Sequence, residues 1–166
     1  DHTARLMREG SVQGAVTTEA EPVQGCRSTR LGRMRYLAVC APAFRAHHFP
    51  QGPTRDALRR APCVHFNPKD ELQTRFMRKI TRADVNPPLH WVPHVDGFLR
   101  MCVAGLAWGM CPQRMVRTCV ARGELVELLP GKPLDVDLYW QSWRLAIGWL
   151  DDFGLALRKR AAQLLD

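Results

Sequence analysis

Short strand-forming runs alternate with helix-forming segments along this 166-residue chain, and this alternation constrains the fold more than any other feature. The strongest strand signal is Arg35–Ala41, which Pro42 ends. Further strands are predicted at residues 13–18, 63–66, 89–93, 107–110, 124–128 and 134–141. Helices are predicted at residues 3–9, 54–60, 69–80, 96–105, 112–121 and 142–165, with Thr54 as an N-cap. This pattern predicts an α/β protein with parallel strands.

The segments between these elements are expected to be irregular. A polar, proline-containing stretch extends to Gly32, and residues 44–53 are predicted to form a loop or a broken helix. The strands at 35–41 and 134–141 flank the middle of the chain. If both connect two lobes, the middle block is a second lobe inserted into the first. Two lobes joined by two crossover strands form a hinged cleft, and small ligands bind at the carboxyl ends of such strands.

Motifs of the common enzyme classes are absent. The sequence contains no G-x-S-x-G, no glycine-rich phosphate loop and no H-E-x-x-H. The six histidines form no recognisable ligand set, and the cysteines show no C-x-x-C spacing. We therefore expect no catalytic residues, no metal and no cofactor, and we predict that the chain is not an enzyme.

The charge is strongly positive, with a formal net charge of +8. Eight arginines and one acidic residue lie between Arg27 and Arg60. This excess of arginine is interpreted as a solvated basic surface, and direct contact with DNA is the alternative.

No apolar run is long enough to span a membrane, and the first residues do not form a signal peptide.

The six cysteines lie mostly in apolar surroundings, which is typical of buried thiols in a reducing cytoplasm. A redox switch between Cys102 and Cys111 is the alternative.

Candidate ligand contacts lie where predicted strands end or helices begin. They are Thr17, Thr18, Phe66, Asn67, Asp96 and Trp108. A helix N-terminus favours anions such as a ligand carboxylate, whereas a carboxylate placed there can pair with a ligand ammonium or guanidinium group. Two of these residues have a structural alternative, because Asp96 is also a candidate N-cap and Trp108 is also a candidate core residue.

An ordered set of segments resembles the effector domain of LysR-type transcriptional regulators, most closely the ArgP/LysG branch that regulates basic amino acid export. The segments are Arg5–Thr17, Leu31–Val39, Phe49–Leu58, Ala107–Pro112, Gly123–Gly131 and Leu138–Trp140. The resemblance covers nearly the whole chain. It implies a periplasmic-binding-protein-like fold, with lobe one at residues 1–41 and 135–166 and lobe two at 42–134.

The resemblance also implies a function. Lysine or arginine would bind between the lobes as the effector of a cytoplasmic regulator that forms dimers or tetramers. DNA would be bound by an N-terminal winged helix-turn-helix, which is expected upstream of Asp1 together with the first strand and helix of the effector domain. Redox-sensing regulators, two-lobed solute-binding proteins and enzymes are the alternatives.

Overall fold

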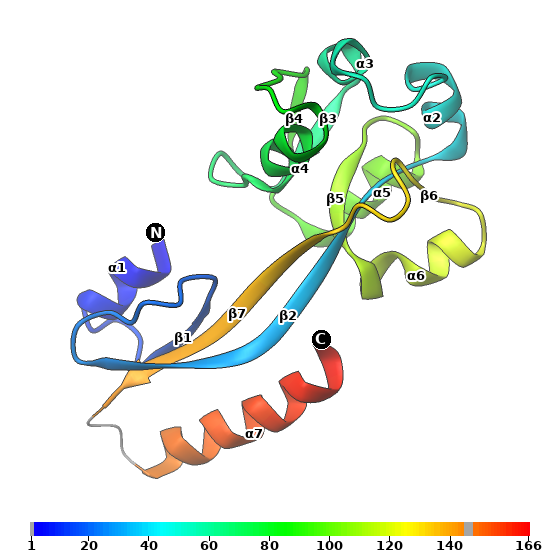
Figure 1. Ribbon diagram of the computed structural model, residues 1–166. Coiled ribbons are helices and arrows are strands. Elements are labelled where there is room, and N and C mark those ends of the chain that lie inside the picture. Colours follow the sequence, from blue (N-terminus) through cyan, green and yellow to red (C-terminus); the bar gives the residue numbers. More distant parts are fainter. Residues whose placement is uncertain (1, 145–147) are drawn as a thin grey trace. The chain divides into compact units, whose positions relative to one another are not determined.

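The computed structural model describes residues 2–144 and 148–166 and divides the chain into two compact units (Figure 1). Unit 1 comprises residues 1–35 and 135–166, and unit 2 comprises residues 36–134. The first boundary between the predicted lobes lies after residue 41, whereas unit 1 ends at residue 35. The predicted lobes and the observed units therefore assign the end of one strand differently.

Unit 1 combines a small sheet with two helices. Its elements are α1 (His2–Arg8), β1 (Gly14–Thr17), the first part of β2 (Cys26–Cys40), β7 (Leu134–Trp143) and α7 (Gly148–Leu164). The strand order is β1-β7-β2, and β1 pairs antiparallel with β7 from Gly14↔Ser142 to Thr17↔Tyr139. A core of Leu31, Trp140, Leu150 and Ala161 joins α7 to the sheet.

The strand β2 begins at Cys26, nine residues before the predicted strand at Arg35. The expectation of an irregular stretch up to Gly32 is therefore wrong from Cys26 onward. Cross-strand ion pairs explain the difference. The Arg30 guanidinium donates to Asp137 Oδ1 at 2.7 Å, and Arg35 Nε donates to Asp135 Oδ1 at 2.8 Å. Opposite charges on neighbouring strands stabilise a sheet without the apolar alternation that sequence patterns detect.

The predicted helix at 142–165 is also corrected. Ser142 and Trp143 belong to β7, and α7 begins at Gly148. Residues 145–147 lie outside the described residues. Ser142 is buried opposite Gly14, so strand pairing extends past the predicted strand end at Gln141.

Unit 2 surrounds short strands with five helices (Figure 1). The helices are α2 (Pro42–His48), α3 (Arg55–Arg60), α4 (Leu72–Thr81), α5 (Val95–Val103) and α6 (Gln113–Ala121). The strands are β3 (Cys63–His65), β4 (Leu89–Trp91), β5 (Gly109–Pro112), β6 (Val126–Glu127) and the end of β2.

Two predictions about helix starts in unit 2 can be compared with the structure. Thr54 Oγ1 accepts a hydrogen bond from Ala57 N at 3.2 Å, which confirms the N-cap. The predicted loop at 44–53 is wrong in its first part, because Pro42 opens a regular helix.

Strand direction differs from the expectation of parallel strands. β3 and β4 pair in parallel, but β5 and β6 both pair antiparallel with β2. The alternation of strands and helices therefore predicts the α/β class but not the direction of each pair. These antiparallel partners are far apart in sequence, so no short turn signal marks them.

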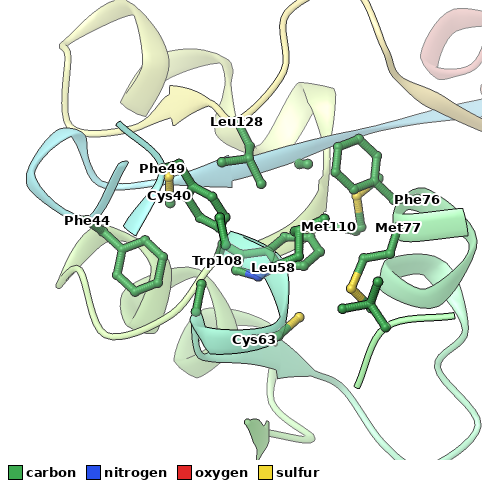
Figure 2. Close-up of a cluster of buried hydrophobic side chains, with 14 of the residues drawn as sticks. Cys40, Phe44, Phe49, Leu58, Cys63, Phe76, Met77, Trp108, Met110 and Leu128 are labelled. Atoms are coloured by element: carbon green, nitrogen blue, oxygen red, sulfur yellow. The ribbon is translucent and has the colours of Figure 1, made fainter. Parts of the chain in front are cut away.

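The larger core of unit 2 is built around Trp108 (Figure 2). Phe76 of α4 packs against Trp108 with 5.8 Å between ring centroids, and both side chains are 0% exposed. Leu58 and Met110 belong to the same cluster of buried side chains. Burial of each such side chain contributes roughly 1.5–3 kcal/mol, so this cluster is a main source of the stability of unit 2.

Candidate ligand-binding site

A cavity of about 530 Å³ lies in unit 1 beside the carboxyl end of β1. This volume falls within the roughly 300–1,000 Å³ typical of small-molecule sites. Strand alternation turns Ala15 and Thr17 of β1 toward it, and one side of α1 contributes Thr3, Met7 and Arg8. The segment after β1 and the β7 residue Gln141 complete the lining.

The segment that follows β1 is fixed by hydrogen bonds. Thr17, 8% exposed, accepts a hydrogen bond at Oγ1 from the backbone N–H of Glu19 at 3.2 Å. Gln141, 3% exposed, donates through Nε2 to the carbonyl oxygens of Glu19 and Glu21, both at 2.9 Å. Its Oε1 accepts from Val23 N at 3.2 Å. One buried amide therefore holds three backbone groups of this segment.

The polar lining of the cavity carries charges of both signs. Glu19 and Glu21 are the acidic residues of the lining, and Arg8 is its basic residue. In a chain with a net charge of +8, this makes the cavity locally negative by one charge. Such a lining can bind a polar, charged small molecule through paired ionic contacts.

The predicted ligand contacts have separate outcomes. Thr17 lines the cavity, whereas Thr18 is exposed and is not part of the lining. Phe66, Asn67, Asp96 and Trp108 belong to unit 2.

Phe66 and Asn67 lie together in a turn at the end of β3. Asp70 accepts from the backbone N–H of Phe66 at 2.9 Å, and Asn67 Oδ1 accepts from Lys69 N at 2.8 Å. The His65 ring contacts the Asp70 carbonyl oxygen through Nδ1 at 3.0 Å. The turn is therefore stabilised by its own side chains. The Phe66 ring is 37% exposed and accessible to a ligand.

Asp96 lies in the first turn of α5, but it does not cap the helix. His94 is the N-cap, because its Nδ1 accepts a hydrogen bond from Gly97 N at 3.1 Å. The capping alternative for Asp96 is therefore wrong, and its exposed carboxylate is left for another role. Its contact with a ligand stays a prediction.

Trp108 lies in the core of unit 2, as its structural alternative proposed. A fully buried side chain presents no surface to a ligand, so we do not retain Trp108 as a wall of an open site. Its indole contributes to packing, and its backbone N–H donates to the Pro62 carbonyl.

Four cysteines of unit 2, namely Cys40, Cys63, Cys102 and Cys111, are buried, and Cys119 is half-buried. Burial raises the pKa of Cys40 to about 12, and burial also raises the pKa of Cys63 well above its ordinary value. The pKa of Cys102 is raised by a hydrogen bond with Cys111 and by burial. These thiols stay protonated near neutral pH, and thiolates are the reactive form. The redox alternative therefore gains no support from the structure.

The described part of the chain contains neither a candidate metal site nor a candidate membrane-spanning helix. Within residues 2–144 and 148–166, no three His, Cys, Asp or Glu side chains are grouped so that they could hold a metal ion. In the same residues, no helix combines the length and the apolar character needed to cross a membrane.

An α/β chain with an inserted unit and a charged small-molecule cavity has the features of a ligand-binding domain. The model of the LysR substrate binding domain matches residues 1–146, and the chain belongs to this family. The predicted α/β, periplasmic-binding-protein-like class is thereby confirmed.

Similar proteins include named regulators. The HTH-type transcriptional regulator ArgP of Pseudomonas aeruginosa is 46% identical over 140 residues, covering 84% of this chain and 46% of that protein. The C-terminal domains of a LysR family protein from Agrobacterium tumefaciens match with a TM-score of 0.95 at 46% identity, over 99% of this chain and 80% of that one.

A third similar structure contains a bound effector. Full-length LysG from Corynebacterium glutamicum with bound effector Arg has a TM-score of 0.85 and 35% identity, over 98% of this chain and 55% of that one. The chain spans about half the length of the curated relatives it matches.

Residues that sequence reasoning missed form most of the polar lining. Glu19 and Glu21 follow a predicted strand directly, so strand-end position and charge could have identified them. Arg8 and Gln141 gave no such signal, because their place in the cavity depends on pairing across the chain.

Proposed function

We propose that this chain is the effector-sensing domain of a LysR-type transcription regulator that responds to lysine or arginine and controls a gene for basic amino acid export. The observation that carries the proposal is the cavity beside β1, which has two carboxylates in its lining although the chain is strongly basic. Membership of the LysR substrate binding domain family and the Arg-bound relative support the same ligand class.

The proposed mechanism is a population shift. A ligand that binds one arrangement of the domain more tightly than another favours that arrangement, and the difference in affinity limits the size of the response. In the full regulator, this response would change how an oligomer of the protein holds DNA through its winged helix-turn-helix. The role is binding and not catalysis, and a regulator of this class acts in the cytoplasm, where its DNA is.

Isothermal titration calorimetry of the protein with lysine and arginine tests this proposal. We expect saturable binding of at least one of them and weaker binding of a neutral amino acid of similar length. Gel-shift titration of the target DNA with the full regulator, with and without that ligand, tests the coupling. Absence of binding by both basic amino acids would refute the proposed effector class.

The unit 2 residues predicted as contacts can be tested in the same assay. If Asp96 pairs with the cationic ligand, Asp96→Ala weakens binding by up to about 1 kcal/mol, because Asp96 is exposed and contacts between exposed charges are worth no more than this. An unchanged affinity would remove Asp96 from the site. Phe66→Ala and Asn67→Ala extend the test to the turn after β3.

A further inference from the structure

The three charged side chains of the cavity match the charges of a basic amino acid one for one. Lysine and arginine each carry an α-ammonium, an α-carboxylate and a cationic side chain at neutral pH. The cavity offers two carboxylates, Glu19 and Glu21, and one guanidinium, Arg8. A neutral amino acid would pair with one carboxylate and leave the other without a cation.

We propose that Glu19 and Glu21 together select ligands with two cationic groups, and that Arg8 binds the ligand carboxylate. The inference rests on the proposed function and adds the groups that determine specificity. It is separate from the contacts predicted in unit 2, because every residue involved belongs to unit 1.

The charged groups are available to a ligand. Among the ion pairs of the described residues, none joins Arg8 to Glu19 or Glu21. All three side chains are exposed. A ligand would therefore gain these contacts without first breaking an internal ion pair.

The backbone that carries the groups is preorganised. Gln141 holds the carbonyl groups of both Glu19 and Glu21 at 2.9 Å. In α1, Met7 is 1% exposed, and its packing anchors the turn of the helix that carries Arg8. Fixing the backbone before the ligand arrives reduces the conformational entropy that binding must overcome.

The size of the effect follows from exposure. Contacts between solvent-exposed charges are worth up to about 1 kcal/mol, which corresponds to about a fivefold change in affinity. Each carboxylate should therefore contribute a modest factor. The wild-type protein should bind a ligand with two cationic groups more tightly than a ligand with one. We expect this difference in affinity to require both Glu19 and Glu21.

The test compares ligands that differ in one charge. Calorimetry measures the affinity of the protein for arginine and for citrulline, which has a neutral ureido group in place of the guanidinium. The variants are Glu19→Gln, Glu21→Gln, their double variant and Arg8→Gln. Asp152→Asn is the matched control, because Asp152 is an exposed carboxylate of the same unit that does not line the cavity.

We expect the ratio of arginine to citrulline affinity to fall by up to about fivefold in the double glutamine variant, because the two ligands differ in one cationic group. Arg8→Gln should weaken both ligands by similar factors and preserve the ratio, since both carry the same carboxylate. Asp152→Asn should change neither affinity. A variant that merely misfolds would lose binding of both ligands together, so the ratio separates selectivity from stability.

Three results would overturn the inference. Arginine binding with an unchanged ratio in the double variant would refute the selective role of Glu19 and Glu21 while leaving the proposed function intact. A fall in the ratio in Asp152→Asn equal to that in the double variant would show a general charge effect. Failure of wild-type protein to bind either lysine or arginine would instead refute the proposed function, and this inference with it.

Discussion

Gln141 is the side chain whose removal should loosen the candidate site most directly. It makes three hydrogen bonds with the segment after β1, to Glu19 O, Glu21 O and Val23 N. In Gln141→Leu these three bonds are lost while a side chain of similar size remains. At about 1 kcal/mol of net stabilisation for each bond, the segment should lose about 3 kcal/mol of protection against local opening.

The exchange rate of the Val23 backbone amide hydrogen measures this loss of protection. Since every 1.4 kcal/mol is a factor of ten, exchange should become about 100-fold faster. Gln13→Leu is the control, because it makes the same chemical change at an exposed position of unit 1 outside the cavity lining. If Val23 N–H keeps its wild-type protection in Gln141→Leu, the Gln141 amide does not hold the segment and does not preorganise it for a ligand.

Three further predictions concern the framework. In Gly109→Ala, the added methyl group would lie 2.7 Å from the Phe98 ring, so we expect the free energy of unfolding, measured with urea, to fall by about 1–3 kcal/mol. Gly148→Ala is the control, because the added methyl group would meet open space and should change this free energy little. Thr54→Ala removes the N-cap of α3 and should cost about 1 kcal/mol in the same assay. A hydrogen bond from arginine lowers the pKa of Asp137, so its contribution to stability is present above the ordinary carboxyl pKa and is lost as pH falls through the lowered value. Thermal unfolding of Asp137→Asn across acidic pH should show a shallower loss than wild type, and a parallel loss would contradict this assignment.

Local chemistry made part of the fold predictable. The Thr54 cap and the buried face of α4 follow from residue types a few positions apart. β2 did not follow from such patterns, because its first half is stabilised by arginines that pair with aspartates about a hundred residues later. Hydropathy alternation contains no signal for such pairs.

The candidate site shows the same division. Thr17 was predicted because it ends a strand, and the structure places it in the cavity lining. Asp96 was considered as a cap, but a histidine two residues earlier takes that place, because its ring nitrogen reaches the same turn. Gln141 could not be predicted, since its partners lie 118–122 residues away and a lone glutamine in a strand has no distinctive pattern.

The position of unit 2 within the sequence has a consequence for synthesis on the ribosome. All its residues are contiguous, so its core around Trp108 can assemble as soon as Leu134 has emerged. By contrast, β1 must wait for Tyr139–Ser142 before it gains its partner strand. Pairings of such long sequence separation form slowly. During that interval the unpaired edges of β1 and β2 are exposed to other chains, so the period before β7 has emerged is when this protein is most prone to aggregate.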